Sequence, residues 1–109
     1  MHMLNVTFSV DPTIQEDFIA YVTTQIIPSL DHKSYLLRIH SDANTHPTLG
    51  LQIEFDSCHT LKDFKNNRLE KTYEHLQASF PNKWVCFTTK LEKLSPLVFI
   101  QKKIWDNIF

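Results

Sequence analysis

The feature that most constrains the fold is a repeated switch in hydrophobic periodicity along the chain. Residues 4–10, LNVTFSV, alternate between apolar and polar side chains, which is typical of a β-strand with one buried face. Asp11 and Pro12 follow, and they suit the N-cap and the first position of a helix. Apolar residues then recur at helical spacing over residues 14–26, so this part of the chain predicts a strand followed by a helix.

The same order returns in the second half of the chain, after a hairpin. Residues 35–40 and 48–55 read as strands on either side of a run of turn formers. Residues 61–80 have a ragged apolar face at helical spacing, and residues 83–92 form a last strand. The order βαββαβ predicts an α+β, ferredoxin-like fold, with a four-stranded antiparallel sheet and both helices on one face.

The chain divides into a predicted ferredoxin-like domain, residues 1–94, and a C-terminal tail, residues 95–109. The apolar residues at helical spacing in this tail are Leu97, Ile100, Ile104 and Ile108. A helix with this much apolar surface would expose a large patch if it stood alone. We therefore expect it to pack on its own domain or on a partner subunit. Binding at a membrane surface is the weaker alternative, because the tail has only two lysines.

Composition narrows the class of protein. A net charge of −1 over 109 residues gives no basic excess for phosphate contacts, so we expect no nucleic-acid partner. Cys58 and Cys86 form no CxxC pair, and no basic, apolar leader opens the sequence. We therefore expect a cytoplasmic protein without a cofactor.

Alternation assigns each strand residue to a face of the predicted sheet. The face toward the helices is expected to hold Leu4, Val6, Phe8, Val10, Leu37, Ile39, Leu51, Ile53, Phe55, Val85, Phe87 and Leu91. The opposite face is expected to hold Asn5, Thr7, Ser9, Leu36, Arg38, His40, Gln52, Glu54, Trp84, Cys86, Thr88 and Lys90.

The polar residues of this second face supply the candidate pocket: Arg38, His40, Glu54 and Lys90. Arg38 and Glu54 have matching parity on adjacent strands, which predicts that they are direct or diagonal neighbours. An ion pair between them would be structural, and we favour this interpretation. A carboxylate and a histidine beside a cleft could instead act as base and acid.

The hairpin segment HSDANTH, residues 40–46, raises the question of a metal site. A metal site needs three or more convergent ligands, whereas Asp42 and Asn44 are also turn formers. We therefore expect His40 and His46 to belong to a polar loop that binds no metal.

The chain also resembles an uncharacterised bacterial family of about one hundred residues, a domain of unknown function. The resemblance rests on NVTFSVDP, IIPSL, LQIEF and FPNKWVCFTTKLE, and it spans roughly residues 3–93. Many relatives have a histidine before the Ile-Pro pair, where this chain has Ile26. The resemblance implies a ferredoxin-like fold of the dimeric α/β-barrel kind and no known activity.

Two functions therefore remain open. The first is a homodimeric small-ligand-binding or scaffold protein, in which the open sheet faces pack around a cavity. The alternative is an enzyme similar to the cofactor-free monooxygenases of the dimeric α/β-barrel type. An RNA-recognition domain is rejected, because it needs exposed aromatics on its central strands, where this chain has Asn5, Thr7, Gln52 and Glu54.

Overall fold

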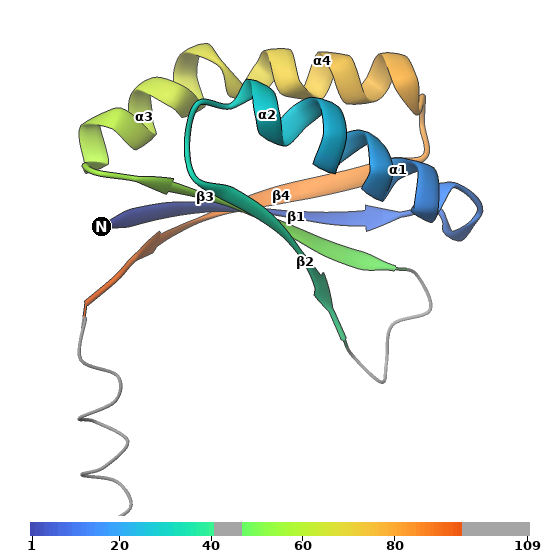
Figure 1. The fold of residues 1–109 in the computed structure, drawn as a ribbon, viewed down its shortest axis with the longest axis horizontal. Helices are drawn as coiled ribbons and strands as arrows, with labels where there is room; N and C mark the ends of the chain where they lie inside the picture. The colour runs from blue at the N-terminus through green and yellow to red at the C-terminus, as the bar shows by residue number, and fades with distance from the viewer. Residues whose placement is uncertain (41–46, 95–109) are drawn as a thin grey trace, which may run out of the picture.

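The computed structural model describes residues 1–40 and 47–94. Its single sheet has the order β2-β3-β1-β4, and every neighbouring pair is antiparallel. The strands are β1 (His2–Val10), β2 (Ser34–Ile39), β3 (Thr48–Phe55) and β4 (Trp84–Glu92). The predicted ferredoxin-like α+β fold is confirmed (Figure 1).

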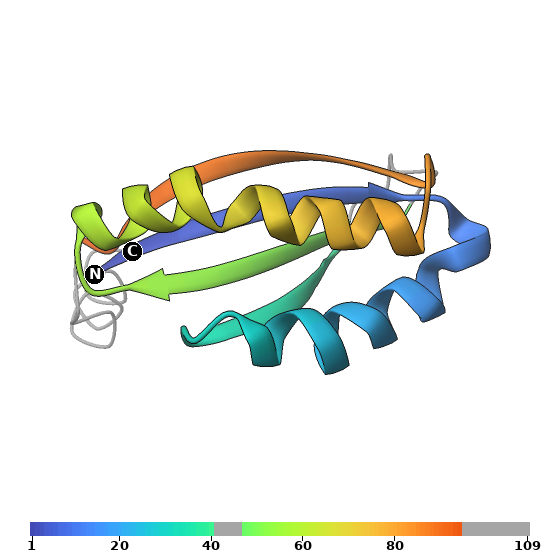
Figure 2. The same cartoon turned by 90° about the horizontal axis from the view of Figure 1, so that it is seen from above.

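The helices form one layer over one face of the sheet, as Figures 1 and 2 show. The first helical segment consists of η1 (Pro12–Ile14), α1 (Gln15–Tyr21), η2 (Val22–Ile26) and α2 (Ile27–Ser29). The second consists of α3 (Cys58–Asn67) and α4 (Leu69–Ser79). The opposite face of the sheet is not covered by any described helix.

The first helical segment begins as predicted and then passes through a proline. The Asp11 carboxylate accepts the Thr13 backbone N–H at 2.9 Å, which caps the segment. A proline inside a helix usually ends or kinks it, but here the chain passes through Pro28 and stays helical to Ser29. The π turn η2 lies just before this proline, and the Ile27 N–H donates to the Val22 carbonyl, five residues back. This wider turn accommodates a proline that has no N–H of its own.

The second helical segment is interrupted at Arg68, which the sequence pattern did not indicate. Arg68 has φ −123°, ends α3 and precedes α4. Its backbone N–H still donates to the Phe64 carbonyl at 2.8 Å, and its side chain donates to the Ser29 carbonyl at 3.0 Å. The break therefore places Arg68 against the end of α2 and joins the two helical segments.

The core lies between the helical layer and the sheet. Its members are Leu4, Val6, Phe8, Val10, Phe18, Val22, Ile26, Leu30, Leu49, Leu51, Ile53, Phe55, Leu61, Phe64, Leu69 and Leu76. Phe8 on the sheet and Phe18 on α1 meet edge to face, with ring centroids 5.3 Å apart. Each large side chain buried in this way contributes roughly 1.5–3 kcal/mol of transfer free energy.

The register of β4 corrects the predicted side-chain parity of that strand. Val10 lies opposite Trp84, and Phe8 lies opposite Cys86. Residues directly opposite in an antiparallel pair share a face, so Trp84 and Cys86 belong to the helix-facing side. Val85 and Phe87 therefore belong to the open face, where they are 68% and 64% exposed. The prediction for this edge strand was wrong.

The predicted parity of β2 was wrong in the same way. Leu36 lies opposite the buried Leu51, and Arg38 lies opposite the buried Leu49. Leu37 and Ile39 consequently belong to the open face. The predicted parity of β1 and β3 was right, because only one side of each of these central strands is apolar and buried.

Candidate ligand-binding site on the open face of the sheet

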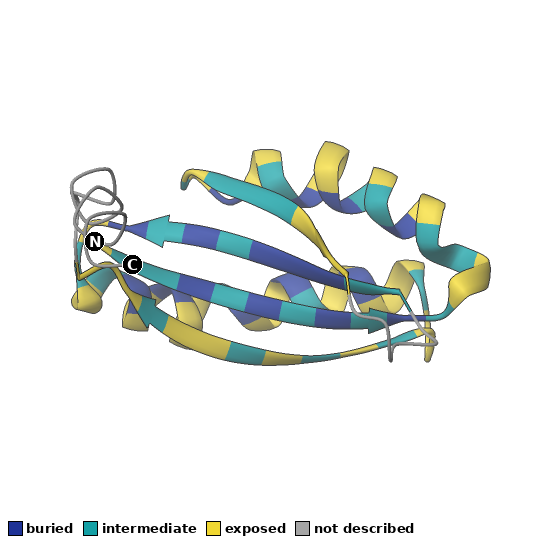
Figure 3. Ribbon diagram, turned by 90° about the horizontal axis from the view of Figure 1, so that it is seen from below, coloured by how far each residue is buried: buried dark blue, intermediate teal, exposed yellow. Residues whose placement is uncertain are grey.

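The sheet face turned away from the helices, here called the open face, combines a polar centre with apolar edges. Figure 3 views the molecule from this side, coloured by burial. Its residues are Met3, Asn5, Thr7, Ser9, Tyr35, Leu37, Ile39, Thr48, Gly50, Gln52, Glu54, Val85, Phe87, Thr89 and Leu91. Among the described residues, the large apolar side chains that are exposed within strands all belong to this face: Leu37, Ile39, Val85 and Phe87. Apolar surface gathered on one face of a sheet commonly marks a site of interaction.

A hollow of ≈ 370 Å³, here called the face hollow, lies on this face between β1, β3 and β4. It is lined by Thr7, Ser9, Thr48, Val85, Cys86 and Phe87. Three hydroxyl-bearing residues, Thr7, Ser9 and Thr48, line one part, and Val85 and Phe87 add apolar surface. This combination can accept an apolar body and orient it through a small number of hydrogen bonds.

Cys86 borders the face hollow, but its side chain has helix-side parity, so the thiol faces the helical layer and Tyr73 and not the hollow. Burial raises the pKa of the Cys86 thiol, and a hydrogen bond with Tyr73 opposes this only in part. Burial and the same bond to Cys86 raise the pKa of the Tyr73 hydroxyl. Both groups are therefore protonated at neutral pH, and Cys86 lacks the thiolate character of a nucleophile.

A second hollow of ≈ 430 Å³, here called the end hollow, adjoins the first where β1 ends and β4 begins. Ser9 and Val85 line both hollows. The end hollow also contains an ion pair, with Lys83 Nζ 3.5 Å from Asp11 Oδ2. The two bonds from Thr13, and then the nearby Lys83 ammonium, hold the pKa of Asp11 below its ordinary value.

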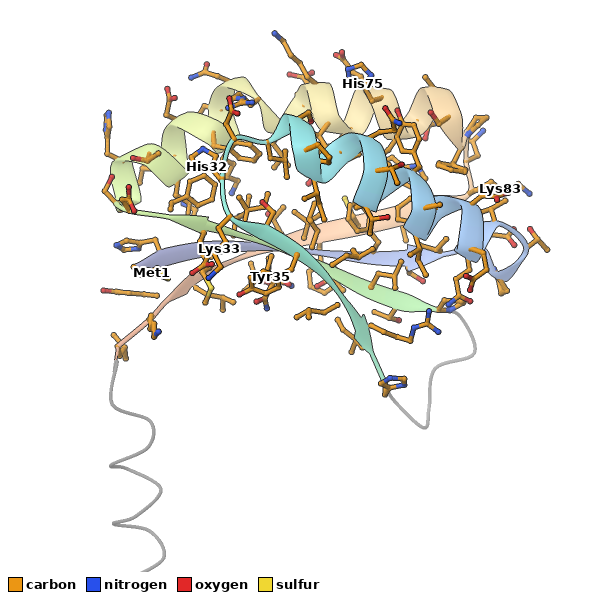
Figure 4. The ribbon with its side chains drawn as sticks, in the orientation of Figure 1. Met1, His32, Lys33, Tyr35, His75 and Lys83 are labelled. Carbon is orange, nitrogen blue, oxygen red and sulfur yellow. The ribbon has the colours of Figure 1, made fainter. Side chains whose placement is uncertain are left out.

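A second ion pair lies at the other end of the sheet, where the Lys33 side chain meets Glu54. Lys33 Nζ is 3.6 Å from Glu54 Oε2, and the two side chains are 79% and 14% exposed. Glu54 Oε2 is buried and accepts no hydrogen bond from the described residues. Figure 4 shows Lys33 and Lys83 at opposite ends of the molecule.

The four residues of the predicted pocket are not brought together. Arg38 and Lys90 lie opposite the buried Leu49 and Leu4, so both have helix-side parity. Glu54 belongs to the open face and pairs with Lys33 instead of Arg38. His40 is exposed just beyond the end of β2. Any role of these four residues in binding stays a prediction.

Sequence reasoning assigned Thr7 and Ser9 to the open face correctly, but it missed the apolar half of the face hollow. Val85 and Phe87 were assigned to the core because their alternation is apolar. Lys83 was not recognised at all, since a lysine at the start of a strand has no special sequence signal. Of the two residues in the ion pair of the end hollow, only Asp11 has a recognisable sequence signal, which is its N-cap position.

The described residues show no metal site and no spanning helix. No group of three or more His, Cys, Asp or Glu side chains in residues 1–40 and 47–94 could hold a metal ion. His46, the second histidine of the hairpin segment, lies outside the described residues. None of the described helices is long and apolar enough to cross a bilayer.

Several solved structures share this fold at low sequence identity. A dimeric ferredoxin-like protein from an uncultured marine organism has a TM-score of 0.63 and 10% identity, covering 89% of this chain and 98% of its own. A Bacillus cereus protein provisionally described as an antibiotic biosynthesis monooxygenase has a TM-score of 0.59 and 15% identity, over 86% and 93%. An ethyl tert-butyl ether D family protein from Bacillus halodurans has a TM-score of 0.57 and 12% identity, over 86% and 100%. These similarities show the fold alone.

At the sequence level, one family model matches. It is described as a domain of unknown function, DUF4286, and it matches residues 1–94. No curated protein sequence matches the chain.

Proposed function

The chain belongs to the DUF4286 family, whose function is unknown, and we propose that its open face binds a small, mainly apolar ligand within a homodimer. The main observation is the face hollow, where hydroxyl groups and exposed apolar side chains meet. Its volume of ≈ 370 Å³ is in the range of small-molecule sites, which are concave and mainly apolar with a few polar groups.

The homodimer supplies a cover for the apolar edges of the open face. Leu37 and Ile39 on β2, together with Val85 and Phe87 on β4, are between 41% and 68% exposed in the single chain. Two open faces packed about 10 Å apart, as in sheet-on-sheet packing, would bury these side chains and enclose the hollow. This is the arrangement of the dimeric α/β-barrel type. One structural neighbour is described as dimeric, which supports the proposal through the shared fold.

Binding is favoured over catalysis by the groups that line the face hollow. Thr7, Ser9 and Thr48 bear hydroxyl groups, whereas the Cys86 thiol lies on the helix-facing side of the sheet and stays neutral. A cofactor-free monooxygenase activity is the alternative, and it has the support of one neighbour's provisional description. A cytoplasmic location is part of the proposal and rests on the expectation from the sequence.

Nuclear magnetic resonance titration with 3-phenylpropionamide, an uncharged probe with an apolar body, tests the proposal. Amide shift changes should concentrate on Thr7, Ser9, Val85 and Phe87. A Phe87→Ser variant should weaken binding. Leu37→Ser also replaces an apolar side chain with serine, but at the opposite edge of the open face, and it should weaken binding less. Shift changes confined to the helical layer, or none at millimolar probe, would contradict the proposal.

A further inference from the structure

The face hollow and the end hollow adjoin each other, because Ser9 and Val85 line both. A ligand whose apolar body lies against Val85 and Phe87 could therefore extend past Ser9 to the end of the sheet. There it would meet Lys83, which is 49% exposed and faces the end hollow. The shape of the combined site thus suits an elongated ligand with one apolar and one polar end.

The end hollow has spare hydrogen-bond donors. Asp11 Oδ1 already accepts two bonds from Thr13, at 2.9 and 2.7 Å, and Asp11 Oδ2 faces Lys83. The Lys83 ammonium carries three N–H groups, and Asp11 is its ion-pair partner among the described residues. Asn82 accepts a bond from Gln77 through Oδ1 at 3.2 Å, which leaves its own amide N–H groups for another acceptor.

The Asp11–Lys83 ion pair also holds the ammonium in place for a ligand. Asp11 is fixed by Thr13, and its backbone N–H donates to the Lys83 carbonyl at 2.9 Å. Because the backbone is already joined by this bond, the ion pair is not needed to hold the two segments together. It places the Lys83 ammonium beside the end hollow.

We propose that the ligand is an amphiphilic carboxylate, which lies with its carboxylate on Lys83 and Asn82 and its apolar body in the face hollow. A carboxylate fits better than an ammonium, because Lys83 and Asn82 have N–H groups to spare while both Asp11 oxygens are engaged. Charge-assisted hydrogen bonds from a lysine to a carboxylate are roughly twice as strong as neutral ones. This inference rests on the proposed function, since it names the ligand class of the same open-face site.

Calorimetric titration with 3-phenylpropionate and 3-phenylpropionamide, which differ mainly in charge, tests the inference. The wild-type protein should bind the acid about tenfold more tightly than the amide. A Lys83→Met variant should bind both probes equally, at the wild-type affinity for the amide. Lys83→Arg should keep most of the preference. Lys33→Met removes the matched lysine at the other end of the sheet, and it should leave both affinities unchanged.

The outcomes separate the two proposals. Equal binding of acid and amide by the wild-type protein would overturn the carboxylate assignment and leave the apolar site standing. Equal loss of the acid preference in Lys33→Met and Lys83→Met would also overturn it, since the effect would then be one of net charge. Binding of neither probe would overturn both proposals. Thermal melting of each variant shows whether it is folded.

Discussion

Thr7 on β1 and Phe87 on β4 are direct register partners, so a hydroxyl and a largely exposed aromatic ring lie side by side on the open face. Cross-strand partners of this kind have Cβ atoms only about 5 Å apart. The polar centre and the apolar edge of the face therefore meet at this pair. It is also where ligand binding and dimer formation can be tested by single substitutions.

Replacing Phe87 with glutamate should break the proposed dimer without unfolding the chain. The ring is 64% exposed in the single chain, so its loss should change intrinsic stability little, whereas a charge between two packed sheets is costly. Light scattering should give the monomer mass of 12.8 kDa for this variant and twice that mass for the wild type. Lys65→Glu, at an exposed position on α3, is the control and should remain dimeric. A wild-type protein that is monomeric at micromolar concentration would exclude the dimer.

Neighbouring leucines on β2 should respond differently to truncation. Leu36 packs against the core, whereas Leu37 is 42% exposed on the open face. Leu36→Ala should lower the free energy of unfolding by about 2 kcal/mol, because it removes packed methyl groups from the core side. Leu37→Ala should change it by less than about 1 kcal/mol in the monomer. Urea unfolding, carried out in the dimer-breaking Phe87→Glu background, measures both changes. A larger loss for Leu37 would support the parity originally predicted for this strand.

The charge of Asp11 should stabilise the protein at neutral pH and lose its effect in acid. Bonds from Thr13 lower the pKa of Asp11 below the ordinary value of 3.8. A carboxylate with a lowered folded-state pKa stabilises the fold above its unfolded-state pKa, and the effect disappears as pH falls through the folded-state pKa. Asp11→Asn keeps a side-chain oxygen for Thr13 but has no charge.

The melting temperature of wild-type protein should therefore exceed that of Asp11→Asn by a constant amount from neutral pH to about pH 4.5. The difference should shrink at lower pH. Asp63→Asn, at an exposed position on α3, serves as the reference variant. If the difference for Asp11→Asn persists unchanged in strong acid, the charge of Asp11 does not stabilise the fold.

Truncation after Leu94 should weaken the protein, although residues 95–109 lie outside the described residues. The sequence predicts that Leu97, Ile100, Ile104 and Ile108 pack on the domain or its dimer partner. Each such side chain would contribute roughly 1.5–3 kcal/mol when buried. We expect a lower melting temperature, aggregation or loss of the dimer. If the truncated chain melts and sediments like the full chain, the tail is not part of the fold, and co-sedimentation with liposomes becomes the next experiment.

Local sequence was sufficient for the order of elements and for the central strands. On β1, the alternation of Leu4, Val6 and Phe8 with polar residues allows only one buried face, and the structure buries that face. Asp11 with Pro12 likewise marks the start of the first helical segment through its own side-chain chemistry. Where a local sequence pattern is compatible with only one structure, the sequence alone predicts that structure.

The faces of the edge strands were decided by tertiary structure. On β4, one parity offers Trp84 and Cys86, and the other offers Val85 and Phe87, so the sequence has no unique apolar side. Pairing with β1 selects the first set for the core, because Trp84 lies opposite the buried Val10. Trp84 then packs edge to face on Phe8, with ring centroids 5.7 Å apart.

The register of the other edge strand, β2 on β3, separated the predicted partners Arg38 and Glu54 and placed Glu54 beside Lys33. When an edge strand has apolar residues on both sides, its own sequence does not determine which side faces the core. The sequence by itself thus determined the βαββαβ order and the core of the central strands. Only the tertiary structure decided which edge side chains face outward, because that choice depends on hydrogen-bond register with a distant strand.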